Sequence, residues 1–122
     1  MNIEEIMSSP VVVTKESTKL KYTRELISRK SINAVPVLKE DGEIAGILSS
    51  SDLAKAHDEN MTVGDIMTEK VHLILKNNRV QDAAKTMIKH SVHHLVVMED
   101  RDVIGMVSSL DIMKSLVLGD KD

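Results

Sequence analysis

The stretch at positions 46–53 reads GILSSSDL, and the stretch at positions 105–112 reads GMVSSLDI. Both place two serines and an aspartate at the same distance behind a glycine. The agreement continues upstream, where Ile6-Met7-Ser8 aligns with Ile66-Met67-Thr68. A match that recurs in the same order along a chain indicates an internal repeat, so the sequence is a duplication of one unit about half its length.

Each repeat predicts the same order of elements: strand, helix, strand, strand, helix. Apolar residues spaced three and four apart predict the first helix, and two β-branched runs around a polar turn predict a hairpin. Ser17-Thr18 and Asn77-Asn78 are residue types that cap helix N-termini, so we expect them to begin the two first helices. The expected elements are strands at 11–13 and 71–75, inward helix faces at Leu20, Thr23, Leu26, Ile27 and at Val80, Ala83, Thr86, Met87, hairpins at 35–38 with 44–48 and 95–98 with 103–107, and closing helices from Leu53 and Ile112.

A half of this length hides too little apolar surface to fold alone. We therefore predict an α+β fold in which motif 1 (1–60) and motif 2 (61–122) pack on each other as one module. A duplicated pair of this kind carries a pseudo-twofold axis, so two related clefts are expected at the seam.

Composition excludes several classes of protein. The chain has 122 residues, 42% hydrophobic and 29% charged, so a globular core is expected. It has no cysteine, which rules out disulfides and thiolate metal sites. The net charge of -3 argues against a general nucleic-acid binder. No apolar run approaches the length of a membrane span and the start of the chain is acidic, so we expect a cytoplasmic protein.

The repeated fragments together resemble the CBS domain family. The resemblance covers nearly the whole chain and rests on the leading phrases, on the strand Ile32-Asn33-Ala34-Val35-Pro36-Val37, and on the twofold pattern of glycine, hydrophobic residue, any residue, serine, any two residues, aspartate. It implies two tandem motifs that fold as one regulatory module. It further implies that adenosine-containing ligands such as AMP, ADP, ATP or S-adenosylmethionine bind in the clefts between motifs, with no cofactor required.

The residues of the repeated phrase suit such a ligand. Glycine lets another group approach the strand backbone closely. A serine hydroxyl at the start of a helix suits a phosphate oxygen, and an ionised aspartate suits the paired hydroxyls of a ribose. The resemblance implies that the aspartate of one motif shares its ligand with two strands of the other. One predicted site joins Ser49 and Asp52 with Val71, His72, Val92 and His93, and the mirror site joins Ser108 and Asp111 with Val11, Val12, Ile32 and Asn33.

The two predicted sites differ from each other and from the family pattern. His93 can gain charge below about pH 6.5 and its counterpart Asn33 cannot, so the sites should be unequal. Ser51 and Leu110 stand just before the two aspartates, where the family often has a basic residue that meets phosphates. AMP-like or adenosyl ligands are therefore favoured over ATP.

Other interpretations of these residues stay open. Ser and Asp before an apolar helix are ordinary helix caps, and the phrase could do only that. His90, His93 and His94 suggest a metal, but His93 and His94 point to opposite faces of a strand, so no metal site is predicted. Serine, histidine and aspartate are present without a Gly-x-Ser-x-Gly elbow, so we predict no catalysis.

The sequence therefore predicts a non-catalytic module that senses an adenosine ligand and signals to a partner protein. The aliphatic residues from Leu110 to Leu118 predict a homodimer through exposed helix faces. A structural interaction scaffold without a ligand is the main alternative. A nucleic-acid binder that uses local basic residues is a less favoured one.

Overall fold

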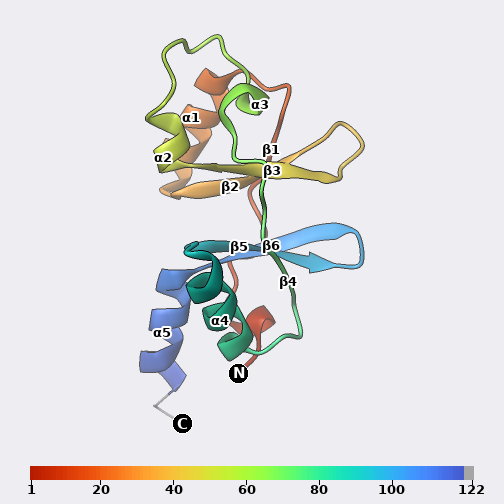
Figure 1. Cartoon of the computed structure of the whole chain (residues 1–122), viewed down its shortest axis with the longest axis vertical. Coiled ribbons are helices and arrows are strands. Elements are labelled where there is room, and N and C mark those ends of the chain that lie inside the picture. Colours follow the sequence, from red (N-terminus) through yellow and green to blue (C-terminus); the bar gives the residue numbers. More distant parts are fainter. Residues whose placement is uncertain (120–122) are drawn as a thin grey trace. The chain divides into compact units, whose positions relative to one another are not determined.

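The computed structural model of the chain describes residues 1–119 and has a mixed α+β fold. Two three-stranded sheets, ordered β1-β2-β3 and β4-β5-β6, carry the helices (Figure 1). The chain separates into two compact units: unit 1 contains Met1–Val11 and the chain from His72 onward, and unit 2 contains Val12–Val71. The predicted fold class and the predicted order of elements are confirmed.

Unit 2 is built from the first repeat without its leading segment, together with the leading segment of the second repeat. Its elements are β1 (Thr14–Lys15), α1 (Leu20–Lys30), β2 (Ala34–Leu38), β3 (Ile44–Ser49), α2 (Ser50–Leu53) and α3 (Val63–Ile66). β1 runs parallel to β2, which forms the predicted antiparallel hairpin with β3. The first strand lies directly after the predicted apolar run 11–13, because only Thr14 and Lys15 pair with β2.

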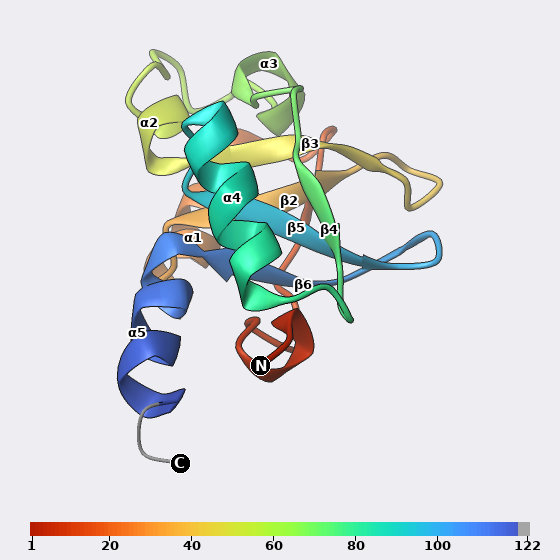
Figure 2. The ribbon, with the colours of Figure 1, turned by 60° about the horizontal axis from the view of Figure 1, so that its bottom comes forward.

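Unit 1 repeats this arrangement. Its elements are the 3-10 helix η1 (Ile3–Glu5), β4 (Leu73–Leu75), α4 (Val80–His90), β5 (His94–Glu99), β6 (Asp102–Ser108) and α5 (Ser109–Gly119). β4 runs parallel to β5 and β5 pairs antiparallel with β6. Figure 2 shows α4 lying across this sheet, whereas α5 leads away from the end of β6.

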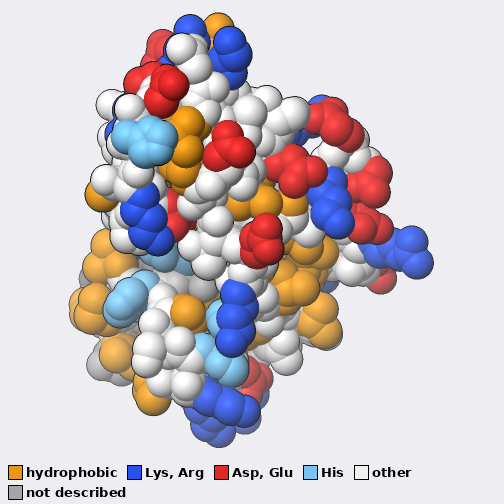
Figure 3. Space-filling model, turned by 45° about the horizontal axis from the view of Figure 1, so that its top comes forward, with side chains coloured by type: hydrophobic (Ala, Val, Ile, Leu, Met, Phe, Trp, Pro, Cys, Tyr) orange, Lys and Arg blue, Asp and Glu red, His pale blue; other side chains and the backbone are white. Residues whose placement is uncertain are grey.

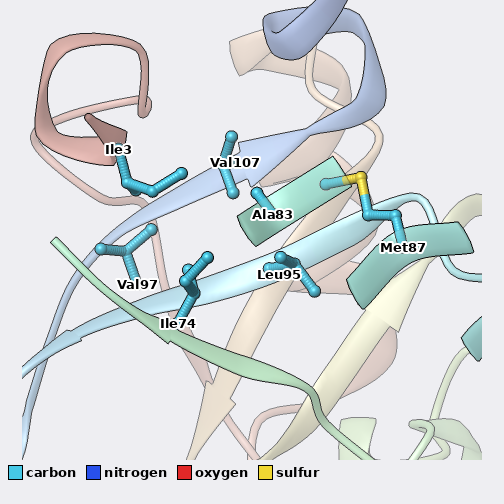
Figure 4. Close-up of a cluster of buried hydrophobic side chains, with 7 residues drawn as sticks. All are labelled: Ile3, Ile74, Ala83, Met87, Leu95, Val97 and Val107. Atoms are coloured by element: carbon cyan, nitrogen blue, oxygen red, sulfur yellow. The ribbon is translucent and has the colours of Figure 1, made fainter. Parts of the chain in front are cut away.

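Each unit has its own apolar core, and three of the four residues predicted for each inward helix face are buried, whereas Leu26 and Thr86 are only half-buried. Leu20, Thr23 and Ile27 of α1 are buried, as are their counterparts in α4. The core of unit 1 (Figure 4) joins η1, α4 and all three strands through Ile3, Ile74, Ala83, Met87, Leu95, Val97 and Val107. The core of unit 2 contains Leu20, Ile27, Val35, Val37, Leu48 and Val63.

The leading segment of each repeat completes the sheet of the other repeat. Ser8 donates its N–H to the carbonyl of Met106 in β6 at 2.8 Å, so the first segment belongs to unit 1. In unit 2, Thr68 of the second leading segment and Ile47 of β3 each donate a backbone N–H to the carbonyl of the other at 2.9 Å. The motif boundaries 1–60 and 61–122 follow the repeats along the sequence and stay a prediction, with 120–122 outside the described residues. The two compact units are divided differently: the leading segment of each repeat belongs to the unit that holds the rest of the other repeat.

The predicted caps of the first helices are wrong. Lys19 and Arg79 hold the N-cap positions of α1 and α4, because Ser17 and Asn78 are engaged elsewhere. The Ser17 hydroxyl donates to Glu40 at 2.6 Å, and the side-chain oxygen of Asn78 accepts the Leu75 N–H at 2.9 Å. The leading segment of the other repeat supplies an acceptor instead: Leu20 N–H donates to Met61 O at 2.7 Å, and Val80 N–H donates to Met1 O at 3.2 Å.

The closing helices begin earlier than predicted and differ in length. Both start inside the repeated phrase, at Ser50 and at Ser109. α2 stops after one turn because the chain beyond it is polar and turns, with the Asp58 side chain accepting the Asn60 N–H at 2.9 Å. α5 continues to Gly119 along the aliphatic run.

Candidate ligand-binding site

The repeated glycines are required by the leading segments. A Cβ added at Gly105 would lie 2.6 Å from the Met7 sulfur and 3.0 Å from the Ser8 carbonyl oxygen. A Cβ at Gly46 would lie 2.6 Å from the Thr68 carbonyl oxygen. The close approach that the sequence predicts is therefore real, and the approaching group is the chain itself.

In unit 2 the repeated phrase forms a compact hydrogen-bonded turn between β3 and α2. The Asp52 carboxylate accepts the N–H of Ser49 at 3.0 Å and the Ser49 hydroxyl at 3.1 Å, both through Oδ2. Its other oxygen, Oδ1, accepts the Thr68 hydroxyl at 3.0 Å. Lys55 adds an ion pair with the same oxygen at 3.8 Å. Asp52 is 2% exposed, so both oxygens are turned into the protein.

In unit 1 the corresponding turn between β6 and α5 is bonded less completely. The Asp111 Oδ2 accepts the Ser108 N–H at 2.9 Å, and the Asp111 N–H donates to the Ser108 hydroxyl at 3.1 Å. This reciprocal pair is a capping box. Asp111 is only partly buried. Across residues 1–119, no hydrogen bond reaches its Oδ1.

The residues Asn33 and His93 lie beside the phrase of their own repeat. The Asn33 carbonyl accepts the Ser50 N–H at 3.0 Å, and the His93 carbonyl accepts the Ser109 N–H at 2.9 Å. Both side chains are exposed. The start of each closing helix is thus fixed to the start of the hairpin, which leaves the Asn33 and His93 side chains free to face solvent.

The remaining predicted site residues are divided between the units. Val12, Ile32, Asn33, Ser49, Asp52 and Val71 belong to unit 2, and Val11, His72, Val92, His93, Ser108 and Asp111 belong to unit 1. Ile32 and Val92 are half-buried and pack against the core of their own unit. Each predicted ligand set takes residues from both units, and those combinations stay a prediction.

The histidines do not converge. The rings of His72 and His90 stack with centroids 4.1 Å apart, while His94 pairs with Ser108 in the sheet. Burial lowers the pKa of His94 from its usual 6.5, the nearby His93 lowers this pKa further, and Asp111 opposes the lowering. Within the described range 1–119, no group of three His, Cys, Asp or Glu side chains could hold a metal ion.

The surface charge is mixed in sign. On the face drawn in Figure 3, Lys and Arg side chains lie among Asp and Glu side chains. Large like-charged areas are what a phosphate backbone requires, and this face does not offer one. None of the helices in 1–119 is long and apolar enough to cross a bilayer.

A sequence model described as CBS domain matches this chain twice, over residues 3–59 and 63–118. The chain belongs to the CBS domain family. The two matches follow the repeat defined by the phrase at 46–53 and 105–112, so the recognised motifs and the internal duplication coincide.

Two known proteins match at least 96% of the chain. The CBS domain pair of protein MJ0100, solved in complex with 5'-methylthioadenosine and S-adenosyl-L-methionine, superposes with a TM-score of 0.87 at 28% identity and covers 100% of this chain and 98% of that one. The uncharacterized protein MJ1426 of Methanocaldococcus jannaschii is 28% identical over 155 residues, covering 96% of this chain and 92% of that protein.

Other curated relatives are longer proteins, of which the chain spans between 20% and 42%. One is inosine-5'-monophosphate dehydrogenase of Staphylococcus aureus, 29% identical over 113 residues that make up 23% of that enzyme. The relationship to such enzymes is therefore confined to the CBS pair.

Sequence reasoning missed the role of Thr68. The alignment of Ile66-Met67-Thr68 with Ile6-Met7-Ser8 marks it as part of a repeated phrase, but nothing along the chain places it beside Asp52. Only the pairing of the leading segment with β3 brings the hydroxyl to the carboxylate.

Proposed function

We propose that this CBS pair binds an adenosine-containing small molecule and that occupancy of the site regulates a partner protein. The observation that carries the proposal is its full-length likeness to the MJ0100 pair, which binds 5'-methylthioadenosine and S-adenosyl-L-methionine. The two chains share 28% of their residues as well as the fold, and the repeated phrase has residue types that suit such a ligand.

The chemistry of recognition follows from the types of residue. A carboxylate accepts hydrogen bonds only, and a ribose offers two adjacent hydroxyl donors, so Asp52, Asp111 or both are the candidate ribose acceptors. Val11, Val12, Val71 and Val92 are candidates for the apolar walls that hold the base.

A ligand with little phosphate charge fits this sequence best. Ser51 and Leu110 precede the two aspartates and carry no positive charge. A triphosphate gains most from arginine or lysine, because charge-assisted hydrogen bonds are the strong ones. Adenosyl compounds and AMP are therefore favoured over ATP.

The output of such a module is a change in what it binds. Ligand shifts an equilibrium only as far as it prefers one state, so the partner must prefer the same state. The apolar surface of α5 offers a contact for a second copy of the chain. Its large side chains Leu110, Met113, Leu116, Val117 and Leu118 are between 53% and 66% exposed.

A ligand-free scaffold is the second candidate function. The observation in its favour is that Asp52 and Asp111 both already accept hydrogen bonds from the helix start. In that case the phrase is a helix cap and α5 is the functional surface.

Calorimetric titration and thermal shift separate the two functions. We expect 5'-methylthioadenosine or S-adenosylmethionine to bind saturably and to raise the melting temperature, since a ligand specific to the folded state stabilises it by mass action. AMP and ATP are titrated in parallel, and ATP should bind more weakly. No heat and no shift with any of the four would favour the scaffold, and salt-sensitive retention of RNA would favour the nucleic-acid alternative.

A further inference from the structure

The two aspartates of the repeated phrase have different surroundings. We infer that Asp52 is a structural carboxylate held by Thr68, and that the adenosine ligand binds through Asp111 alone, one ligand per chain. The inference rests on the proposed function and narrows it from two equivalent carboxylates to one.

The hydrogen-bonding capacity of Asp52 is used within its own unit. Oδ2 accepts both the N–H and the hydroxyl of Ser49, and Oδ1 accepts the Thr68 hydroxyl at 3.0 Å. At 2% exposure the carboxylate has no open side. A ribose hydroxyl could reach Oδ1 only by displacing the Thr68 hydroxyl, which exchanges one hydroxyl-to-carboxylate hydrogen bond for another with no net gain, and the buried carboxylate would have to be opened first at a cost.

Asp111 is equipped for the ligand instead. One oxygen accepts the Ser108 N–H, and the Asp111 N–H donates to the Ser108 hydroxyl. Oδ1 accepts no hydrogen bond from any residue between 1 and 119, and the side chain is partly exposed. A ribose hydroxyl can reach this oxygen without breaking a hydrogen bond.

The difference traces to one position in the leading segments. Thr68 and Ser8 are counterparts, and each pairs with the strand that carries the repeated glycine. Threonine is β-branched, which restricts its χ1 and can hold the hydroxyl toward Asp52. Serine rotates more freely, and the Ser8 hydroxyl makes no hydrogen bond with Asp111 within the described chain. The difference between Thr68 and Ser8 therefore leaves Asp52 as a helix cap in one repeat and Asp111 as a ligand acceptor in the other.

The test is titration of 5'-methylthioadenosine into the full chain and into matched aspartate variants. We expect one equivalent bound per wild-type chain, binding at least tenfold weaker in Asp111→Ala, and binding within about threefold of wild type in Asp52→Asn. Asparagine at position 52 can still accept from Ser49 and donate to Thr68, so this variant should keep the fold. Circular dichroism and a cooperative melt confirm that each variant is folded.

Stability supplies a second readout that needs no ligand. Asp52→Ala removes three hydrogen bonds from a buried site and should lower the melting temperature more than Asp111→Ala, which removes one. Thr68→Val keeps the charge of Asp52 and removes the hydroxyl, so it should lower the melting temperature and leave binding unchanged.

The outcomes that overturn the inference are distinct from failure of the proposed function. Two equivalents of equal affinity, or tenfold weaker binding in folded Asp52→Asn or Thr68→Val, would show that Asp52 or Thr68 contacts the ligand. Absence of any binding to the wild-type chain would instead refute the proposed function, and the Asp111 site with it.

Discussion

The buried threonine pair of unit 2 gives a sharp test of how this core is stabilised. Thr14 of β1 and Thr23 of α1 share a hydrogen bond of 2.8 Å between their hydroxyls, with the side chains 7% and 1% exposed. In unit 1 the corresponding positions are Ile74 and Ala83, which are equally buried and apolar. The chain thus contains a polar and an apolar solution to the same packing problem.

The expected free energies follow from burial. Replacing one threonine leaves the other hydroxyl buried without a partner, which costs about 1–3 kcal/mol. Thr14→Ile together with Thr23→Ala copies the unit 1 pair, keeps the side-chain volume similar and leaves no unpaired hydroxyl. The double variant should therefore lie within about 1 kcal/mol of wild type, because replacing both partners of a buried hydrogen bond is nearly neutral.

The assay is a double-mutant cycle measured by urea unfolding. We expect Thr14→Ile and Thr23→Ala to be destabilising alone and to restore each other when combined, giving a coupling energy above about 1 kcal/mol. Purely additive single losses would refute the reasoning, since they would mean that the hydroxyl pair contributes nothing beyond the volume of its side chains.

Three further predictions concern single positions. Gly105→Ala should destabilise the fold by about 1–3 kcal/mol, because the new Cβ would overlap the Met7 sulfur and the neighbouring carbonyl; an unchanged urea midpoint would mean that the leading segment moves away at no cost. Ser91 ends α4 in the left-handed region with φ at 54°, so Ser91→Gly should stabilise by up to about 1 kcal/mol, and a lower melting temperature would contradict this. Burial holds the pKa of His94 below its usual 6.5, so on acidification the unfolded chain takes up a proton at this position before the folded chain does. Stability should therefore fall as the pH drops below about 6.5, and it should level off once the pH is below the folded-state pKa. His94→Gln should flatten this part of the stability profile, and an equal slope in both proteins would assign the loss to other groups.

Much of the fold could be predicted because the sequence contains the same order of elements twice. Spacing of apolar residues in the first helices and β-branching around the polar turns gave the right elements in the right order. The helix starts could not be predicted from local types, because the acceptors that replace a cap at Leu20 and Val80 come from Met61 and Met1. Residue preferences near a helix start carry no information about a distant segment.

The site residues stay a prediction, and the bonding of the repeated phrase could not be predicted from the sequence. Ser49 and Asp52 are hydrogen-bonded to each other, and Gly46 lies against Thr68. Their inequality with Gly105, Ser108 and Asp111 depends on Thr68, and a tertiary contact of this kind leaves no local signature. The sequence predicts unequal sites from His93 and Asn33, whereas the inequality of the two aspartates is visible only in the packing.

The exchange of leading segments also bears on how such a chain can be divided. Ile3 is fully buried in a core whose other members come from beyond position 72, so a fragment cut between the repeats would carry a vacant groove along β6. We expect such a fragment to fill this groove only by binding the leading segment of another molecule. Because the two repeats are joined in one chain, each leading segment stays at high effective concentration beside the sheet that it completes, and the exchange takes place within one molecule.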